Sequence, residues 1–247
     1  MIKNHINPRK YRLMLVDDEM TIRFITKASL EKFGFEVVDF ESPVEAISYY
    51  RNEYSNIDFV ILDMFMPEMN GDEVFYQLLN INPFMVSIVL SGYDNVEEIY
   101  KYLLDHGLKD FLKKPINPDV LCSEIVRIIN ENMTVDVNKG LSMLVNNEST
   151  YIKLLKIYQE QYNDLNAKFK DCLVNDDLMG IDNIIHKIKG ISLNLGGNDL
   201  YIYSSDLHQK FRKNEVEIHD IFRFVKYHNI FVKDIERVLD AQSEWKF

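Results

Sequence analysis

The sequence predicts an α/β domain with a doubly wound, five-stranded parallel sheet, followed by a second domain that is an all-α helical bundle. In the first half, short apolar runs alternate five times with amphipathic helical patterns, which is typical of a parallel sheet covered by helices on both faces. After about residue 130, long helical patterns replace the strand-like runs. A polar cluster at residues 130–134 separates the two patterns, so we expect domains at residues 1–131 and 132–247.

The first domain is expected to consist of five strand–helix units. Apolar runs predict the strands, and helical spacing of apolar residues predicts the helices. Ser42 and Pro43 are expected as the N-cap and first residue of the second helix. The expected strands are residues 13–16, 35–40, 57–62, 85–90 and a short run around Phe111. The expected helices with defined limits are residues 19–33, 42–54, 95–105 and 118–130.

The second domain carries apolar residues at spacings of three and four over long stretches. Helices of this length with short connections favour an antiparallel bundle. The expected helices are residues 151–172, 178–195, 199–211 and 218–239, with a short leading helix within residues 135–145.

Composition limits the classes of function and partner. The formal net charge of −11 argues against nucleic acid as the main partner, because phosphate binding needs a basic surface. Cys122 and Cys172 form neither a disulfide framework nor a metal-ligand spacing. No run approaches the ~20 apolar residues of a membrane helix, and the N-terminus has no signal-peptide pattern. We therefore expect a cytoplasmic protein with neither membrane nor nucleic acid as a partner.

Three acidic residues fall where strands of the predicted sheet end. Asp17 and Asp18 follow the first strand, and Asp63 follows the third. Each has an ordinary interpretation alone, since Asp17 or Asp18 would serve as a helix N-cap and Asp63 as a solvated loop residue. The carboxyl ends of parallel strands lie on one edge of the sheet, so the three carboxylates are expected to converge there. Such a cluster favours Mg²⁺.

Two more residues at strand ends complete a set that suits phosphoryl transfer. Ser91 follows the fourth strand and offers a hydroxyl, and Lys114 follows the fifth strand and offers an ammonium. Alone, Ser91 is better interpreted as a turn serine, and Lys114 as a surface lysine. With the acids, they supply an acceptor carboxylate and groups that neutralise charge on phosphoryl oxygens.

Four motifs in this order resemble the receiver domain of two-component response regulators over residues 10–131. The motifs are Leu-Val-Asp17-Asp18-Glu19, Asp63-Met-Phe-Met-Pro67-Glu-Met-Asn-Gly71, Leu90-Ser91-Gly92 and Phe111-Leu-Lys-Lys114-Pro115. The resemblance implies a flavodoxin-like fold in which Asp63 accepts a phosphoryl group as an acyl phosphate. It implies that Ser91 contacts the phosphoryl group, that Lys114 pairs with it, and that Phe111 is a switch aromatic rather than a plain core residue. The Mg²⁺ ligands that it implies are Asp17, Asp18, Asp63 and the main-chain carbonyl of Phe65.

The second domain contains one histidine in a distinctive setting. His186 lies within a predicted helix, and Lys189 and Gly190 follow at the spacings that share its face. A glycine inside a helix costs about 1 kcal/mol relative to alanine, so clearing space beside the imidazole is a reason for it. Neutral imidazole is a nucleophile near pH 7. A helical histidine beside a lysine is more often a solvated surface residue, and this is the interpretation given to the remaining histidines, His5, His106, His208, His219 and His228.

The run that starts at His186 resembles the signature of histidine phosphotransfer (HPt) domains, and the resemblance covers residues 135–240. These domains are helical bundles with an exposed phosphorylatable histidine, and Gly196 stands where they carry a second glycine. Lys189, Gly190 and Gly196 are thereby expected to support a phosphohistidine. Ile191 departs from the pattern, since small or hydroxylic residues are common there.

These features predict a phosphorelay protein, and a second hypothesis for the function stays open. An upstream phosphohistidine would phosphorylate Asp63, and His186 would pass phosphoryl groups to or from receiver aspartates, with the direction open. The alternative is a phosphorylation-controlled switch whose helical domain only binds a partner.

A phosphatase is discounted because Phe65 stands where its general acid would be. No Gly-rich nucleotide loop is present, so the chain is expected not to be a kinase, although it could be the tail of a hybrid histidine kinase. The expected partners are a sensor histidine kinase and other receiver or HPt proteins, and the helix at residues 95–105 offers a face for dimerisation.

Overall fold

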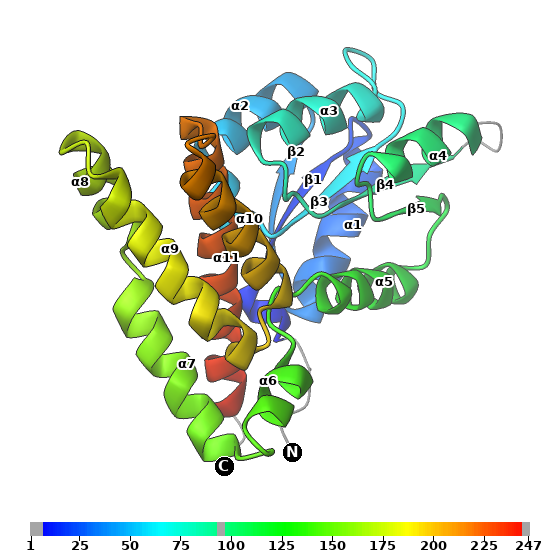
Figure 1. Cartoon of the computed structure of the whole chain (residues 1–247). Coiled ribbons are helices and arrows are strands. Elements are labelled where there is room, and N and C mark those ends of the chain that lie inside the picture. The colour runs from blue at the N-terminus through cyan, green and yellow to red at the C-terminus, as the bar shows by residue number, and fades with distance from the viewer. Residues whose placement is uncertain (1–6, 93–96, 244–247) are drawn as a thin grey trace. The chain divides into compact units, whose positions relative to one another are not determined.

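The computed structural model describes residues 7–92 and 97–243. They divide into two compact units, and the boundary along the chain falls between Asn132 and Met133. The first unit contains a five-stranded parallel sheet (Figure 1) with strand order β2-β1-β3-β4-β5. The strands are β1 (Arg12–Val16), β2 (Glu36–Phe40), β3 (Phe59–Asp63), β4 (Ser87–Ser91) and β5 (Asp110–Lys113). The predicted doubly wound fold is confirmed.

Helices cover both faces of this sheet, because successive strand residues point to opposite sides. In β1, Met14 packs with residues of α2 and α3, whereas Leu15 packs with residues of α1 and α5. Each face therefore has its own apolar core, as the near-continuous apolar strands predict. The helices are α1 (Met20–Phe33), α2 (Pro43–Glu53), α3 (Gly71–Ile81), α4 (Glu97–Asp105) and α5 (Pro118–Glu131).

The predicted start of α2 is confirmed, with Ser42 as the N-cap residue and Pro43 as the first helical residue. Ser42 occupies the N-cap position of α2, but its side chain makes no capping hydrogen bond. Its hydroxyl instead donates to Glu68 Oε2 at 3.1 Å. The acceptor lies in the loop after β3, a long-range partner that local sequence rules do not contain.

The second unit is the helical bundle that the periodicity predicts. Its core is lined by aromatic and aliphatic residues from every long helix, among them Tyr151, Phe169, Ile185, Leu200 and Phe231. None of the described helices combines the length and the apolar character that a membrane crossing requires. The helices are α6 (Val137–Met143), α7 (Glu148–Tyr162), α8 (Leu165–Val174), α9 (Leu178–Ser192), α10 (Asn198–Lys213) and α11 (Ile218–Ser243).

The predicted single helix over residues 151–172 is wrong, because α7 ends at Tyr162 and α8 begins at Leu165. Asn163 and Asp164 form the turn between them. Their short polar side chains compete with helical hydrogen bonding and favour turns and caps. Tyr162 and Leu165 both remain buried, so the apolar spacing continues across the break and conceals it.

The surface interpretation of His228 is also wrong, and the correction has a measurable consequence. His228 on α11 is fully buried, with aromatic neighbours that include Tyr158 and Phe224. Burial lowers the pKa of His228 to about 3, and the neighbouring Asn229 opposes this with a smaller upward effect. The unfolded chain, with a histidine pKa near 6.5, therefore binds the proton more strongly than the folded chain between these values.

We therefore expect the bundle to lose stability as the pH falls from 6.5 toward 3. Between pH 7.5 and pH 5, His228 alone removes about 2 kcal/mol from the free energy of unfolding. The measurement is chemical denaturation followed by circular dichroism at both pH values, for wild type and His228→Phe. The substitution should remove that part of the pH dependence, whereas His219→Ala, at an exposed site, should retain it. Equal pH dependence in wild type and His228→Phe would exclude this role.

Candidate functional site

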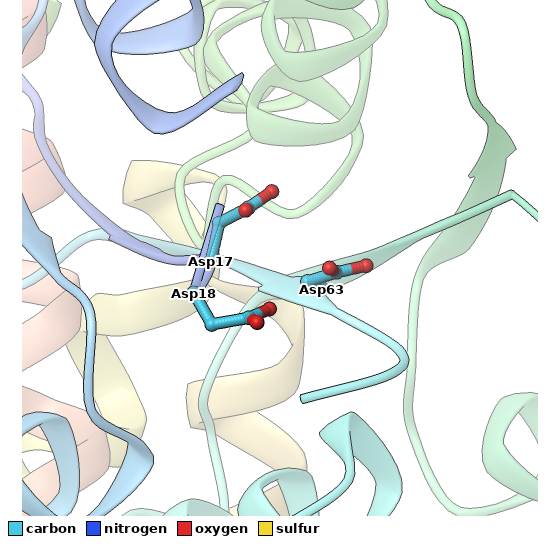
Figure 2. Close-up of side chains that lie close together, drawn as sticks. All are labelled: Asp17, Asp18 and Asp63. Carbon is cyan, nitrogen blue, oxygen red and sulfur yellow. The ribbon is translucent and has the colours of Figure 1, made fainter. Parts of the chain in front are cut away.

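Three carboxylates meet at the carboxyl edge of the sheet. Asp17 directly follows β1, and Asp63 is the last residue of β3, which lies beside β1. A carboxylate oxygen of each of Asp17, Asp18 and Asp63 lies within 4.8 Å of one from the other two. Figure 2 shows the three side chains grouped at these strand ends. The parallel pairing of neighbouring strands is the reason why residues 46 positions apart converge.

One ammonium group lies among these acids. Lys114 follows β5, and its Nζ is 2.8 Å from Asp17 Oδ2 and 3.0 Å from Asp63 Oδ1. Burial by itself lowers the pKa of Lys114, but its hydrogen bonds to the two carboxylates outweigh that effect, so the net pKa lies above the ordinary value. The side chain therefore stays charged near neutral pH. The neighbouring Lys113 is exposed on β5.

Asp63 is held in a poorly solvated position. Burial raises its pKa, the hydrogen bond and the charge of Lys114 lower it, and the charge of Asp17 raises it again, with a net upward shift. Three acids and one ammonium leave an excess of negative charge in this cluster. Hard carboxylate oxygens with excess charge are suitable ligands for Mg²⁺, so the residues present fit the metal that the sequence predicts.

Hydrogen bonds from Glu19 and Arg23 hold Asp17 at the end of β1. The main-chain N–H of Glu19 donates to Asp17 Oδ1 at 2.9 Å, and Arg23 Nη1 donates to the carbonyl oxygen of Asp17 at 2.7 Å. Arg23 also pairs with Asp39 and Glu41 at 3.3 and 3.0 Å. Arg23 is not among the predicted site residues, because an arginine in a helical sequence pattern is typical of ordinary surface charge.

The loop after Asp63 returns closely to the strand end. Gly71 N–H donates to the carbonyl oxygen of Met64 at 2.8 Å. A Cβ on Gly71 would lie 2.3 Å from the carbonyl oxygen of Asp63, so only glycine allows this approach. Asn70 and Glu73 form a capping box that starts α3 directly beside the site. Phe65 lies within this loop and is exposed, and the metal-ligand role of its carbonyl remains a prediction.

Ser91 and Phe111 occupy neighbouring strands. Ser91 is the buried last residue of β4, and its carbonyl oxygen accepts a hydrogen bond from Lys114 N–H at 2.7 Å. Phe111 on β5 is 38% exposed, so the plain core interpretation of this ring is wrong. Its ring stacks on Tyr100 of α4, with centroids 4.1 Å apart and planes 16° apart. Tyr100 itself is buried.

In the helical unit, His186 lies on the exposed face of α9, opposite the buried stripe of Ile181, Ile185 and Ile188. Lys189 Nζ lies 5.8 Å from the ring centroid of Tyr201. A Cβ on Gly190 would have no described atom within 4 Å, so this position is open. Gly196 adopts a φ of +83° directly after the short 3₁₀ turn Leu193–Leu195.

The surface interpretation of His208 is wrong, and two residues near His186 were missed. The His208 side chain, on α10, is only 13% exposed, and its Nδ1 lies 2.6 Å from Asp182 Oδ1. The ring centroids of His186 and His208 are 5.1 Å apart. Helical spacing places Asp182 on the face of His186, but the approach of His208 depends on how α9 and α10 pack, which no local pattern contains.

Comparison with known proteins identifies the first unit. Residues 13–126 match the family model of the response regulator receiver domain. The CAI-1 autoinducer sensor kinase/phosphatase CqsS of Vibrio cholerae is 32% identical over 116 residues, which cover 46% of this chain and 17% of that protein. The response regulator SaeR of Staphylococcus aureus is 24% identical over 220 residues, which cover 85% of this chain and 92% of that protein. A solved receiver domain protein from Clostridium thermocellum is 30% identical over 49% of this chain and 95% of its own, with a TM-score of 0.47.

The chain spans between 17% and 59% of the length of the first four curated relatives that it matches. The matched segment contains all the strand ends that carry the acidic cluster, the serine and the lysine. Receiver domains are phosphoryl-accepting signalling domains of two-component systems. Residues 13–126 of this chain are therefore a response regulator receiver domain, and a helical region follows it.

Proposed function

We propose that the chain is a two-site phosphorelay protein. Asp63 accepts a phosphoryl group from a phosphohistidine, and His186 relays phosphoryl groups to or from receiver aspartates. The observation that carries the first site is the contact of Lys114 with both Asp17 and Asp63 inside a cluster of three carboxylates. The exposed position of His186, beside an open glycine, supports the second site.

At the first site, a carboxylate oxygen of Asp63 attacks the phosphorus atom, and the P–N bond of the donor phosphohistidine breaks as the new P–O bond forms. Lys114 neutralises charge on the phosphoryl oxygens, and the Ser91 hydroxyl donates to one of them. Mg²⁺, held by Asp17, Asp18, Asp63 and the carbonyl of Phe65, would supply further positive charge to those oxygens. Phe111 and Tyr100 lie on the elements next to Ser91, so they are placed to respond to its movement.

At the second site, a ring nitrogen of His186 is the nucleophile or the leaving group, according to the direction of transfer. Gly190 keeps the approach to the imidazole free of side-chain atoms, and Lys189 offers a cation one helical turn away. The partners are a sensor histidine kinase and other receiver or HPt proteins. The chain would receive its phosphoryl group from such a partner.

The first test is Mg²⁺-dependent labelling with a small phosphodonor such as acetyl phosphate. Wild type should acquire a label that is lost in base, as an acyl phosphate is, and EDTA should reduce that label to background. Lys114→Gln should lower the amount of label strongly, because it removes the cation that pairs with the phosphoryl group. Excess Mg²⁺ added after EDTA should restore labelling. Equal labelling with and without EDTA would contradict the metal assignment.

A further inference from the structure

A second imidazole lies beside the proposed phosphohistidine and is itself held by a carboxylate. Asp182 and His186 are four residues apart on α9, and His208 reaches them from α10, which runs alongside α9 (Figure 1). His208 Nδ1 is 2.6 Å from Asp182 Oδ1. The side chain of His208 is 13% exposed and that of Asp182 is 26% exposed, so solvent reaches this pair only in part.

The carboxylate determines which atom of His208 remains for other contacts. Asp182 accepts a hydrogen bond, so the proton of a neutral His208 resides on Nδ1 and the lone pair on Nε2. Rings with centroids 5.1 Å apart are close enough for facing nitrogens to reach hydrogen-bond distance after a small side-chain rotation. His186 is exposed and has room for that rotation.

We propose that Asp182 and His208 form a positioning pair that orients and activates His186. This inference rests on the proposed function of His186 as a phosphoryl carrier. His208 Nε2 accepts the N–H of one ring nitrogen of His186, which leaves the lone pair of the other ring nitrogen directed away from α10. Asp182 holds His208 in the tautomer that allows this contact.

The same contact stabilises the charge that develops during transfer. When His186 receives a phosphoryl group, the lone pair of its free nitrogen forms the N–P bond, and the P–O bond of the aspartyl phosphate breaks with its electron pair left on the carboxylate. The imidazole of His186 gains positive charge in this step. His208 accepts a hydrogen bond from its remaining N–H, and Asp182 offsets the charge that spreads to His208.

The competing explanation is that Asp182 and His208 only join α9 to α10. A purely structural pair would change stability but leave the reactivity of His186 in the folded protein unaltered. The discriminating quantity is therefore the rate constant for phosphorylation of His186 at saturating donor, compared with the melting temperature of each variant. A substitution of His208 can keep its hydrogen bonds without the imidazole ring. If such a substitution restores the rate, the two explanations are separated further.

The experiment uses the full-length chain with Asp63→Ala, so that label reaches His186 only by direct reaction. Phosphoramidate is the donor, and ammonia is its leaving group. The label is scored as the phosphate that is stable in base and lost in acid, and mass spectrometry locates it at His186. His208→Ala should lower the rate constant roughly 10-fold or more. His208→Gln should recover most of the rate, because its amide oxygen accepts from His186 while its amide N–H donates to Asp182.

His219→Ala is the matched control, since His219 also pairs with a carboxylate, Glu217 at 3.0 Å, but is exposed outside this cluster. It should label at the wild-type rate. A wild-type rate in His208→Ala, with His186 of the parent protein labelled normally, would overturn the positioning role and leave the proposed function intact. No label on His186 of the parent or wild-type chain would overturn the proposed function and this inference together.

Discussion

Asp63→Asn is expected to abolish the base-labile phosphorylation of the receiver domain. The amide has nearly the shape of the carboxylate, but it lacks the nucleophilic oxygen that forms the acyl phosphate. Its carbonyl oxygen can still accept the hydrogen bond that Lys114 Nζ now donates to Asp63 at 3.0 Å. The charge of Asp17 raises the pKa of Asp63, so the two carboxylates repel each other. The substitution removes one of the three clustered negative charges and with it this repulsion. The fold should therefore remain intact while the label falls to background.

The measurement is acetyl phosphate labelling in Mg²⁺, with thermal unfolding of the same samples. Asp58→Asn is a matched control, because Asp58 directly precedes β3 at the end opposite Asp63, where its Oδ2 accepts from the main-chain N–H of Arg12. The control should label as wild type does. Base-labile phosphate that persists at wild-type level in Asp63→Asn would move the acceptor to another residue.

Gly196→Ala is expected to destabilise the helical unit by about 4 kcal/mol. A Cβ at this position would lie 2.0 Å from the carbonyl oxygen of Asp136 and 2.7 Å from its carbonyl carbon. Both are main-chain atoms, so neither can move without displacing the start of α6. The φ of +83° adds the strain of a left-handed conformation for a residue with a side chain. The total is a large part of the 5–15 kcal/mol that stabilises a typical domain.

Gly190→Ala gives the opposite result at a position six residues earlier. Apart from the adjacent backbone of α9, no described atom lies within 4 Å of the place that a Cβ would take, and α9 should gain about 1 kcal/mol from the better helix former. Hydrogen exchange of peptides from α9 and α10, read by mass spectrometry, compares the two variants within the same unit. Exchange should be much faster than wild type in Gly196→Ala and no faster in Gly190→Ala. Equal protection in both variants would contradict the packing found around Gly196.

The sheet and its acidic edge were predictable because their signals are local. Buried parallel strands are short apolar runs, and a parallel sheet gathers their carboxyl ends, so the approach of Asp17 to Asp63 follows from the order of elements. The bundle was predictable for the same reason, through helical periodicity. The break at Asn163 was not, because the buried positions of Tyr162 and Leu165 keep the spacing that periodicity detects.

Other features depend on contacts between distant segments. His208 and Asp182 are 26 residues apart and meet only because of the register between α9 and α10. His228 has the same identity as the exposed His219, and only packing in the bundle core distinguishes their exposure. The exposed ring of Phe111 depends on the edge position of β5 and on Tyr100, which a list of motifs does not contain. The sequence therefore predicted the fold better than it predicted the exposure and the contacts of these side chains.

The central claim is that one chain carries two phosphorylatable residues of different chemistry. The most direct measurement treats the wild-type chain with phosphoramidate and Mg²⁺, then divides the label into base-labile and acid-labile phosphate. The claim predicts both kinds, with the base-labile label at Asp63 and the acid-labile label at His186, and it predicts that His186→Ala loses only the acid-labile label. Acid-labile phosphate that is absent from wild type, or unchanged in His186→Ala, would contradict the relay and leave a receiver domain joined to a helical binding module.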